Sequence, residues 1–218
     1  ALNTAGTDQI TVTVNDANGA ALTAANLSTL GGKTAGTVTV TNAVAITGDH
    51  DQVTAALVTA GTKVEVDDAT VTINDANATA ITAAELSAVG GATLGTVTVT
   101  NAVAIEGTAA EVTAALVTAG TKVEVDDPTV NITTTPTIGA LNLIAAETTG
   151  VVTATLAADS LANLAALNTA GTDQITVTVN DANGAALTAA NLSTLGGKTA
   201  GTVTVTNAVA IEGTAAEV

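Results

Sequence analysis

The chain has 218 residues, of which 47% are hydrophobic, and it contains no Phe, Tyr, Trp, Cys or Met. Its 20 acidic residues against four Lys and Arg give a net charge of −16, and such a surface repels nucleic-acid phosphates and anionic lipids. Without aromatic residues there is no platform on which bases stack, so the composition argues against nucleic-acid binding. The lack of cysteine excludes disulfide and thiol chemistry, and no apolar run reaches the roughly 18 residues of a membrane-spanning helix.

A glycine stands before each main strand that the sequence predicts. The intervals between successive glycines range from about 21 to about 34 residues, a period that is typical of repeat architectures. The same order of patterns recurs within each interval. These glycines are Gly6, Gly36, Gly61, Gly95, Gly120, Gly150, Gly171 and Gly201.

The unit that begins at Gly95 shows the order of elements clearly. Valines alternate with threonines over residues 96–100, which predicts a half-buried strand, and a second alternating strand follows over residues 103–105. Residues 108–111 have the Thr-x-x-Glu spacing of a capping box, which predicts the start of a short amphipathic helix. Gly120 then stands where a C′ glycine would end that helix. Each unit is therefore expected to contain a strand, a corner, a second strand and a helix.

Other units follow this order with local changes. Thr82 and Glu85 repeat the capping-box spacing. Pro128 falls between two alternating pairs of valines and isoleucine, which indicates a corner because proline is poorly tolerated inside a central strand. Residues 15–19 predict a longer corner rich in Asn, Asp and Gly, and the least regular unit covers residues 133–150.

Longer repeats lie above these units. Ala1–Ile46 reappears letter for letter as Ala166–Ile211, and a second repeat relates Gly36–Ile73 to Gly95–Ile132 with few substitutions. We therefore expect a super-repeat of six coils over residues 1–165 that restarts at residue 166. Both ends of the chain interrupt a predicted helix, so we expect the chain to be a window on a longer array or one unit of an end-to-end assembly.

These patterns predict an α/β solenoid, because one unit cannot bury its own apolar face whereas stacked units can. Strands of successive coils would pair in parallel sheets, as in leucine-rich repeats or β-helices, and residues 1–218 would form one continuous array. The stretch GTVTVTNAVAI occurs three times and would form the wall of a coil. In its first copy we expect Val38, Val40, Val44 and Ile46 to point inward and the threonines to face water.

Acidic residues gather at the predicted corners, which would stack in a solenoid. Acids of adjacent coils could then share Ca²⁺, a cation that takes about six to eight oxygen ligands. The alternative is that Asp and Asn are good corner residues that face water, and neither an EF-hand loop nor a GGxGxD nonapeptide accompanies them. The candidate calcium ligands are Asp67, Asp68, Asp126, Asp127, Asp16, Asp75 and Asp181.

His50 is the only histidine, and it follows Asp49, a predicted helix N-cap with Gln52 three residues later. The flanking acids allow a metal site, but one His with two Asp is a weak ligand pattern, and a solvated helix start explains it equally. A Ser-His-Asp hydrolase would need this same histidine, and the sequence has no GxSxG motif. We therefore expect no enzymatic activity and no catalytic residue.

Rows of threonine offer a different interpretation. Thr37, Thr39 and Thr41 would face outward, and flat solenoids with Thr-x-Thr ladders resemble some ice-binding proteins. However, Glu65 and Glu124 take the matching outward positions in the intervening coils. A charge on every second rung interrupts the plane, and threonine on a strand is commonly explained by β-propensity alone, so ice binding is the minor alternative.

Two segments carry a resemblance to a known class of proteins. The stretches AETTGVVTATLAADSLANLAAL and TVTVTNAVAIEGTAAEVTAALVTAGTKVEV look like the long Thr/Ala/Val arrays in very large secreted surface proteins of bacteria, cyanobacteria especially. The resemblance covers essentially the whole chain and implies an extracellular array in a surface layer, a fibre or an adhesive stalk. Those proteins often carry RTX calcium nonapeptides, which this chain lacks, so neither their calcium-dependent folding nor any site residue is carried over.

Together, the repeats and the resemblance predict a structural segment of a long extracellular protein. It would form or decorate a cell-surface filament, fibre or surface layer, and its partner would be itself, through end-to-end or lateral assembly. The alternative is an adhesin stalk or a calcium-stabilised binding module.

Overall fold

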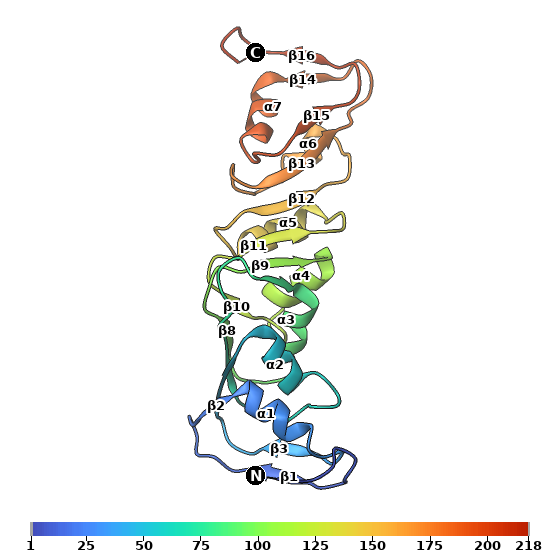
Figure 1. Cartoon of the computed structure of the whole chain (residues 1–218). Helices are drawn as coiled ribbons and strands as arrows, with labels where there is room; N and C mark the ends of the chain where they lie inside the picture. Colours follow the sequence, from blue (N-terminus) through green and yellow to red (C-terminus); the bar gives the residue numbers. More distant parts are fainter. Residues whose placement is uncertain (1, 218) are drawn as a thin grey trace. The chain divides into compact units, whose positions relative to one another are not determined.

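The computed structural model describes residues 2–217, in which short strands and short helices alternate along the chain (Figure 1). The strands are β1 (Val12–Val14), β2 (Ala21–Thr23), β3 (Val38–Val40), β4 (Ala45–Gly48), β5 (Glu65–Val66), β6 (Thr70–Ile73), β7 (Ala80–Thr82), β8 (Val97–Val99), β9 (Ala104–Gly107), β10 (Glu124–Val125), β11 (Thr129–Ile132), β12 (Val152–Thr155), β13 (Gln174–Val179), β14 (Ala186–Thr188), β15 (Val203–Val205) and β16 (Ala210–Glu212). The helices are α1 (Ala24–Gly31), α2 (His50–Leu57), α3 (Ala83–Gly90), α4 (Ala109–Leu116), α5 (Ile138–Ala145), α6 (Leu161–Leu164) and α7 (Ala189–Gly196). The fold is a repeating α/β arrangement, which confirms the predicted alternation of strands and helices.

The chain divides into two compact units. The first extends to Ile105 and includes Ala114–Pro128, and the second consists of Glu106–Thr113 and the residues from Thr129 onward. Each unit has parallel strands and a core of its own. Within residues 2–217, no helix is long and apolar enough to cross a membrane.

Parallel sheets join successive coils of the first unit, where a coil is the stretch from one strand-preceding glycine to the next. The sheets have the strand orders β1-β3-β5 and β10-β8-β6-β4-β2. Their register places equivalent residues side by side, so that Val12 lies beside Val38 and Leu22 beside Ile46. The predicted parallel pairing of repeats is therefore confirmed.

The coil Gly61–Leu94 differs from the predicted two-strand unit because it contains three strands, β5, β6 and β7. Strand β5 pairs with β3, which is the first strand of the preceding coil. Strand β6 pairs on one side with β4, the second strand of its coil, and on the other side with β8, the first strand of the following coil. On one side of β6 this sheet therefore contains β4 and β2, which are the second strands of their coils. On the other side it contains β8 and β10, which are the first strands of theirs. Periodicity predicts each strand but not the neighbour with which it pairs, so the expectation of two strands was wrong for this coil.

The second unit repeats the parallel arrangement with a different coil length. Strands β11, β12, β13 and β15 follow one another in one sheet, and β14 pairs with β16 in another. Val130 lies beside Val152, and Ala154 beside Ile175. The coil between Gly150 and Gly171 contains the single strand β12 before the short helix α6. The shortest coil therefore contributes one strand, whereas the longest, Gly61–Leu94, contributes three.

Neighbouring coils, and not the local sequence alone, bury the apolar side chains. The expected inward residues Val38, Val40, Val44 and Ile46 are buried, with at most 2% of each exposed. Ile211 occupies the position of Ile46 in the identical copy, yet it is 52% exposed. The difference follows from pairing, because β4 lies between β2 and β6 whereas β16 pairs with β14 alone among the residues described. Each coil thus completes the core of the next.

The predicted helix starts are confirmed, whereas one predicted helix end was wrong. Thr82 and Glu85 form a reciprocal capping box, and the Glu111 carboxylate accepts from the Thr108 backbone N–H at 2.8 Å. The Thr108 hydroxyl also donates to this carboxylate. The bond from the backbone, and to a smaller extent the bond from the hydroxyl, hold the pKa of the Glu111 carboxyl below its usual value. Helix α4 ends at Leu116, four residues before Gly120, so this glycine does not cap it.

Buried threonines tie successive coils together two residues before several of the strand-preceding glycines. Thr34, Thr93 and Thr199 are each no more than 8% exposed, and their hydroxyls accept the backbone N–H of Gly36, Gly95 and Gly201, respectively. The same hydroxyls donate to backbone carbonyls about one coil earlier in the sequence. These Thr-x-Gly ties satisfy backbone groups that would otherwise be buried without partners.

Asp173 has a related role and is 2% exposed. Its Oδ1 accepts the Val152 N–H and its Oδ2 accepts the Ala170 N–H, both at 2.9 Å. A buried carboxylate thus supplies two acceptors to backbone donors that would otherwise lack a partner. No motif in the sequence marks this residue.

Ala78 offers a test of the corner geometry. It has φ 63°, whereas Gly19 and Gly184, at the same position of related coils, have φ 75° and 79°. All three backbone N–H groups donate to the following coil, as in the 2.8 Å bond from Ala78 to Ala102 O. Because this left-handed region favours glycine, Ala78→Gly should raise the free energy of unfolding by about 1 kcal/mol. Denaturant unfolding measures the change, and the control Gly184→Ala should lower stability by a similar amount; the opposite signs would contradict the argument.

Candidate functional site

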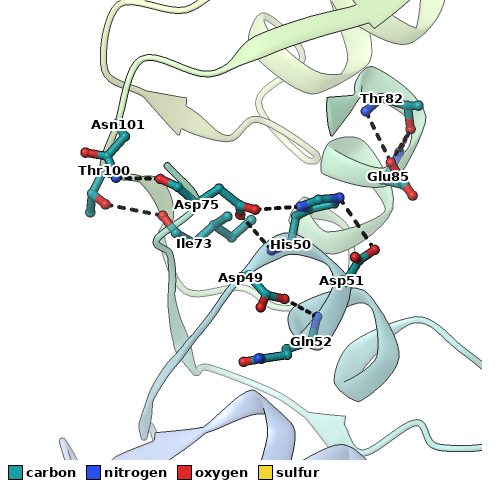
Figure 2. A network of polar contacts seen from close by, with 10 residues as sticks. All are labelled: Asp49, His50, Asp51, Gln52, Ile73, Asp75, Thr82, Glu85, Thr100 and Asn101. Atoms are coloured by element: carbon teal, nitrogen blue, oxygen red, sulfur yellow. Dashed lines mark hydrogen bonds and ion pairs between the residues drawn. The ribbon is translucent and has the colours of Figure 1, made fainter. Parts of the chain in front are cut away.

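A polar, partly buried cluster lies where helix α2 meets the corner after β6. Asp75 follows the end of β6 and has a side chain only 6% exposed. Its Oδ2 accepts the His50 backbone N–H at 2.7 Å, and its Oδ1 lies 2.8 Å from Nδ1 of the His50 ring. Figure 2 shows Asp75 between this histidine and Asn101, whose side-chain amide donates to the Asp75 backbone carbonyl. The corner of one coil therefore holds the helix start of the preceding coil.

His50 is the first residue of α2, after the N-cap Asp49, whose carboxylate accepts the Gln52 N–H at 2.8 Å as predicted. The histidine side chain is 17% exposed, and its Nε2 lies 3.5 Å from Oδ1 of Asp51. Burial acts to lower the pKa of His50, but the hydrogen bond and charge of Asp75, with the charges of Asp51 and Glu85, outweigh it and raise the pKa above 6.5. The site therefore favours the imidazolium.

The chemistry available to this cluster is the binding of a proton. Both polar contacts of the ring are with carboxylates, which stabilise its cationic form. Two of the serines have structural contacts instead. Ser87 donates to Ala84 O within its helix, and Ser160 caps α6. The expectation that the chain is not an enzyme stays a prediction.

Residues at the position of Asp75 in two other coils also accept the first backbone N–H of a helix. Thr134 Oγ1 accepts the N–H of Ala109, the first residue of α4, at 3.0 Å. Asp181 Oδ2 accepts the N–H of Leu161, the first residue of α6, at 2.7 Å. The corner therefore supplies a second helix cap from the next coil, in addition to the local N-cap. In the sequence, Asp181 matches Asp16 through the first long repeat, and Thr134 matches Asp75 just beyond the end of the second, but these matches do not show which helix each corner reaches.

The candidate calcium ligands fall into two groups. Asp75 and Asp181 use carboxylate oxygens to cap helices, as described above. The others are exposed at corners: Asp16, Asp67, Asp68, Asp126 and Asp127. In residues 2–217, His, Cys, Asp and Glu side chains form no group of three or more that could hold a metal ion. Calcium binding thus stays a prediction.

The outward threonine rows are interrupted as expected. The register places Thr39 beside Glu65, and Thr98 beside Glu124. Acidic side chains therefore stand on the next rung of each row, which is the arrangement that counts against a regular ice-binding plane. Ice binding itself stays an untested alternative.

No protein family, curated protein or solved structure matches this chain. Its function must therefore be inferred from the repeat and from the contacts that the repeat makes.

Proposed function

We propose that the chain is a segment of an α/β solenoid whose function is structural, and that it gives length to an extracellular filament, fibre or surface layer. The observation that carries this proposal is that copies of the same sequence make the same hydrogen bonds to the following coil. Gly19 N–H donates to Ala43 O at 2.7 Å, and Gly184 N–H, in the identical copy of this segment, donates to Ala208 O at 2.7 Å. A protein can extend such an array by adding coils without a new fold.

The inter-coil ties support the same proposal. Asn42 donates its side-chain amide to Asp16 O, and Asn207 does the same to Asp181 O. Thr34 and Thr199 make corresponding bonds to Ile10 and Ile175. Because each of these ties joins a coil to its neighbour, the same junction can be repeated along an array of any length. The extracellular location rests on the resemblance to secreted bacterial surface arrays, and the proposed partner is a second copy of the chain.

Electron microscopy of the purified chain tests the proposal. We expect elongated particles that join into fibres as protein concentration rises, because unpaired strand edges are templates for pairing with another chain. Dispersed particles at every concentration would contradict assembly and leave the role of a spacer. Parallel samples with millimolar Ca²⁺ and with a chelator address the second candidate, a calcium-stabilised stalk, whose candidate ligands include the exposed Asp67, Asp68, Asp126 and Asp127. Fibres that need no calcium would argue against that candidate.

A further inference from the structure

Two equivalent junctions between coils differ in one chemical respect. His50 and Asp75 align with Ala109 and Thr134 when Gly36–Asp75 is superposed in sequence on Gly95–Thr134. In both junctions the corner residue accepts the first backbone N–H of the helix, at 2.7 Å from His50 to Asp75 and at 3.0 Å from Ala109 to Thr134. The backbone tie is therefore common to both, and only the first junction adds a side chain that binds a proton.

The ring geometry makes that addition depend on protonation. Nδ1 of His50 lies 2.8 Å from Asp75 Oδ1, and Nε2 lies 3.5 Å from Asp51 Oδ1. An imidazolium has an N–H on both nitrogens and can serve both carboxylates, whereas neutral imidazole has one N–H and can serve only one. Removal of the proton therefore takes away a donor and the attraction between opposite charges at the same time.

The charged groups around His50 are all acidic. Its own helix provides Asp51 and the N-cap Asp49, the corner after β6 provides Asp75, and the first turn of α3 provides Glu85. The neighbouring elements α1, β4 and β6 contain no titratable residue. A cation at a helix N-terminus is opposed by the helix dipole, and these carboxylates are what offset that opposition.

We propose that His50 and Asp75 form a proton-operated latch between two coils, which holds α2 to the corner after β6 more firmly in mildly acidic than in alkaline solution. Ala109 and Thr134 are the version of the same junction that does not respond to protons. Because His50 binds its proton more tightly in the folded chain, the added stability is complete below pH 6.5 and is lost as the pH rises through the folded-state value. The latch depends on contacts within the first unit and does not require the proposed structural role.

The first test follows the protonation of His50 by NMR, which is unambiguous because the chain has one histidine. In the wild-type chain the ring should titrate above pH 6.5. Asp75→Asn keeps an acceptor for the helix N–H but removes the charge, so it should weaken proton binding by about tenfold, equivalent to about one pH unit. An unchanged titration midpoint in this variant would overturn the pairing.

The second test compares thermal unfolding of the wild-type chain with that of the double variant His50→Ala/Asp75→Thr, which copies the neutral junction. Acidification reduces the repulsion within this acidic chain in both proteins, so the double variant is the baseline. As the pH is lowered from about 8 to about 5.5, the melting temperature of the wild type should rise relative to that of the double variant. Equal pH dependence in the two proteins would overturn the latch, and the result does not depend on whether the chain forms fibres.

Discussion

Replacement of Gly95 by alanine should lower the free energy of unfolding by about 3 kcal/mol. Gly95 precedes β8 and passes next to the corner of the preceding coil. An added Cβ would lie closer than 3.0 Å to the carbonyl carbon and oxygen of Ala69. Ala69 is fully buried, and its carbonyl also accepts the Thr93 hydroxyl, so the backbone there has little freedom to move away. The substitution therefore strains the contact between two coils.

Gly120→Ala is the matched control, because Gly120 also precedes a predicted strand. No atom lies within 4 Å of a Cβ built at this position, and its φ is outside the left-handed region. This variant should be neutral or stabilised by up to about 1 kcal/mol, since alanine reduces the entropy of the unfolded chain. Denaturant unfolding followed by far-UV circular dichroism measures both variants. An equal loss in the two would show that glycine flexibility, and not the close approach of coils, is responsible.

These two glycines illustrate what local sequence can predict. Both precede a strand, and the alternation that follows them predicts the burial of Val97, Val99 and Val123. The contact that separates their roles is with a residue of another coil, which no local pattern contains. By contrast, the capping box at Thr82 and Glu85 can be predicted from the sequence, because both partners lie within one helical turn.

The topology was harder to predict for the same reason. Strand β6 reads as an ordinary alternating segment, yet it pairs with β4 on one side and β8 on the other. Strand β6 takes this place in the sheet because its coil contains three strands instead of two. Repeat spacing predicts that coils stack, but the order of strands in each sheet comes from the long-range pairing.

The candidate site was predicted in part. Local spacing identifies Asp49 as the helix cap, and His50 draws attention because it is the only histidine. Neither signal shows that Asp75, in the following coil, binds the same helix start. An alignment of Gly36–Asp75 with Gly95–Thr134 would have paired His50 with Ala109 and Asp75 with Thr134. This simultaneous change of two positions is the signal that could have indicated a contact.

The buried Thr-x-Gly ties lead to the second large expected effect. Thr199→Val should lower the free energy of unfolding by about 3 kcal/mol, although the two side chains have nearly the same shape. The Thr199 hydroxyl accepts the N–H groups of Ile175 and Gly201, each at 2.8 Å, and its own proton is directed to the carbonyls of Asp173 and Ile175. Valine fills the space but leaves both N–H groups without this acceptor in a buried place.

Thr204→Val isolates the contribution of the hydroxyl. Thr204 lies in β15 and is exposed, so its replacement by another β-branched residue should change stability by no more than about 0.5 kcal/mol. Urea unfolding of the two variants side by side gives the difference, and hydrogen exchange at Ile175 and Gly201 should accelerate in Thr199→Val alone. Comparable stability of the two variants would mean that backbone rearrangement or water replaces the lost acceptor. A selective loss would show that the threonines of this chain serve two purposes, with the exposed ones supporting strand structure and the buried ones joining each coil to the next.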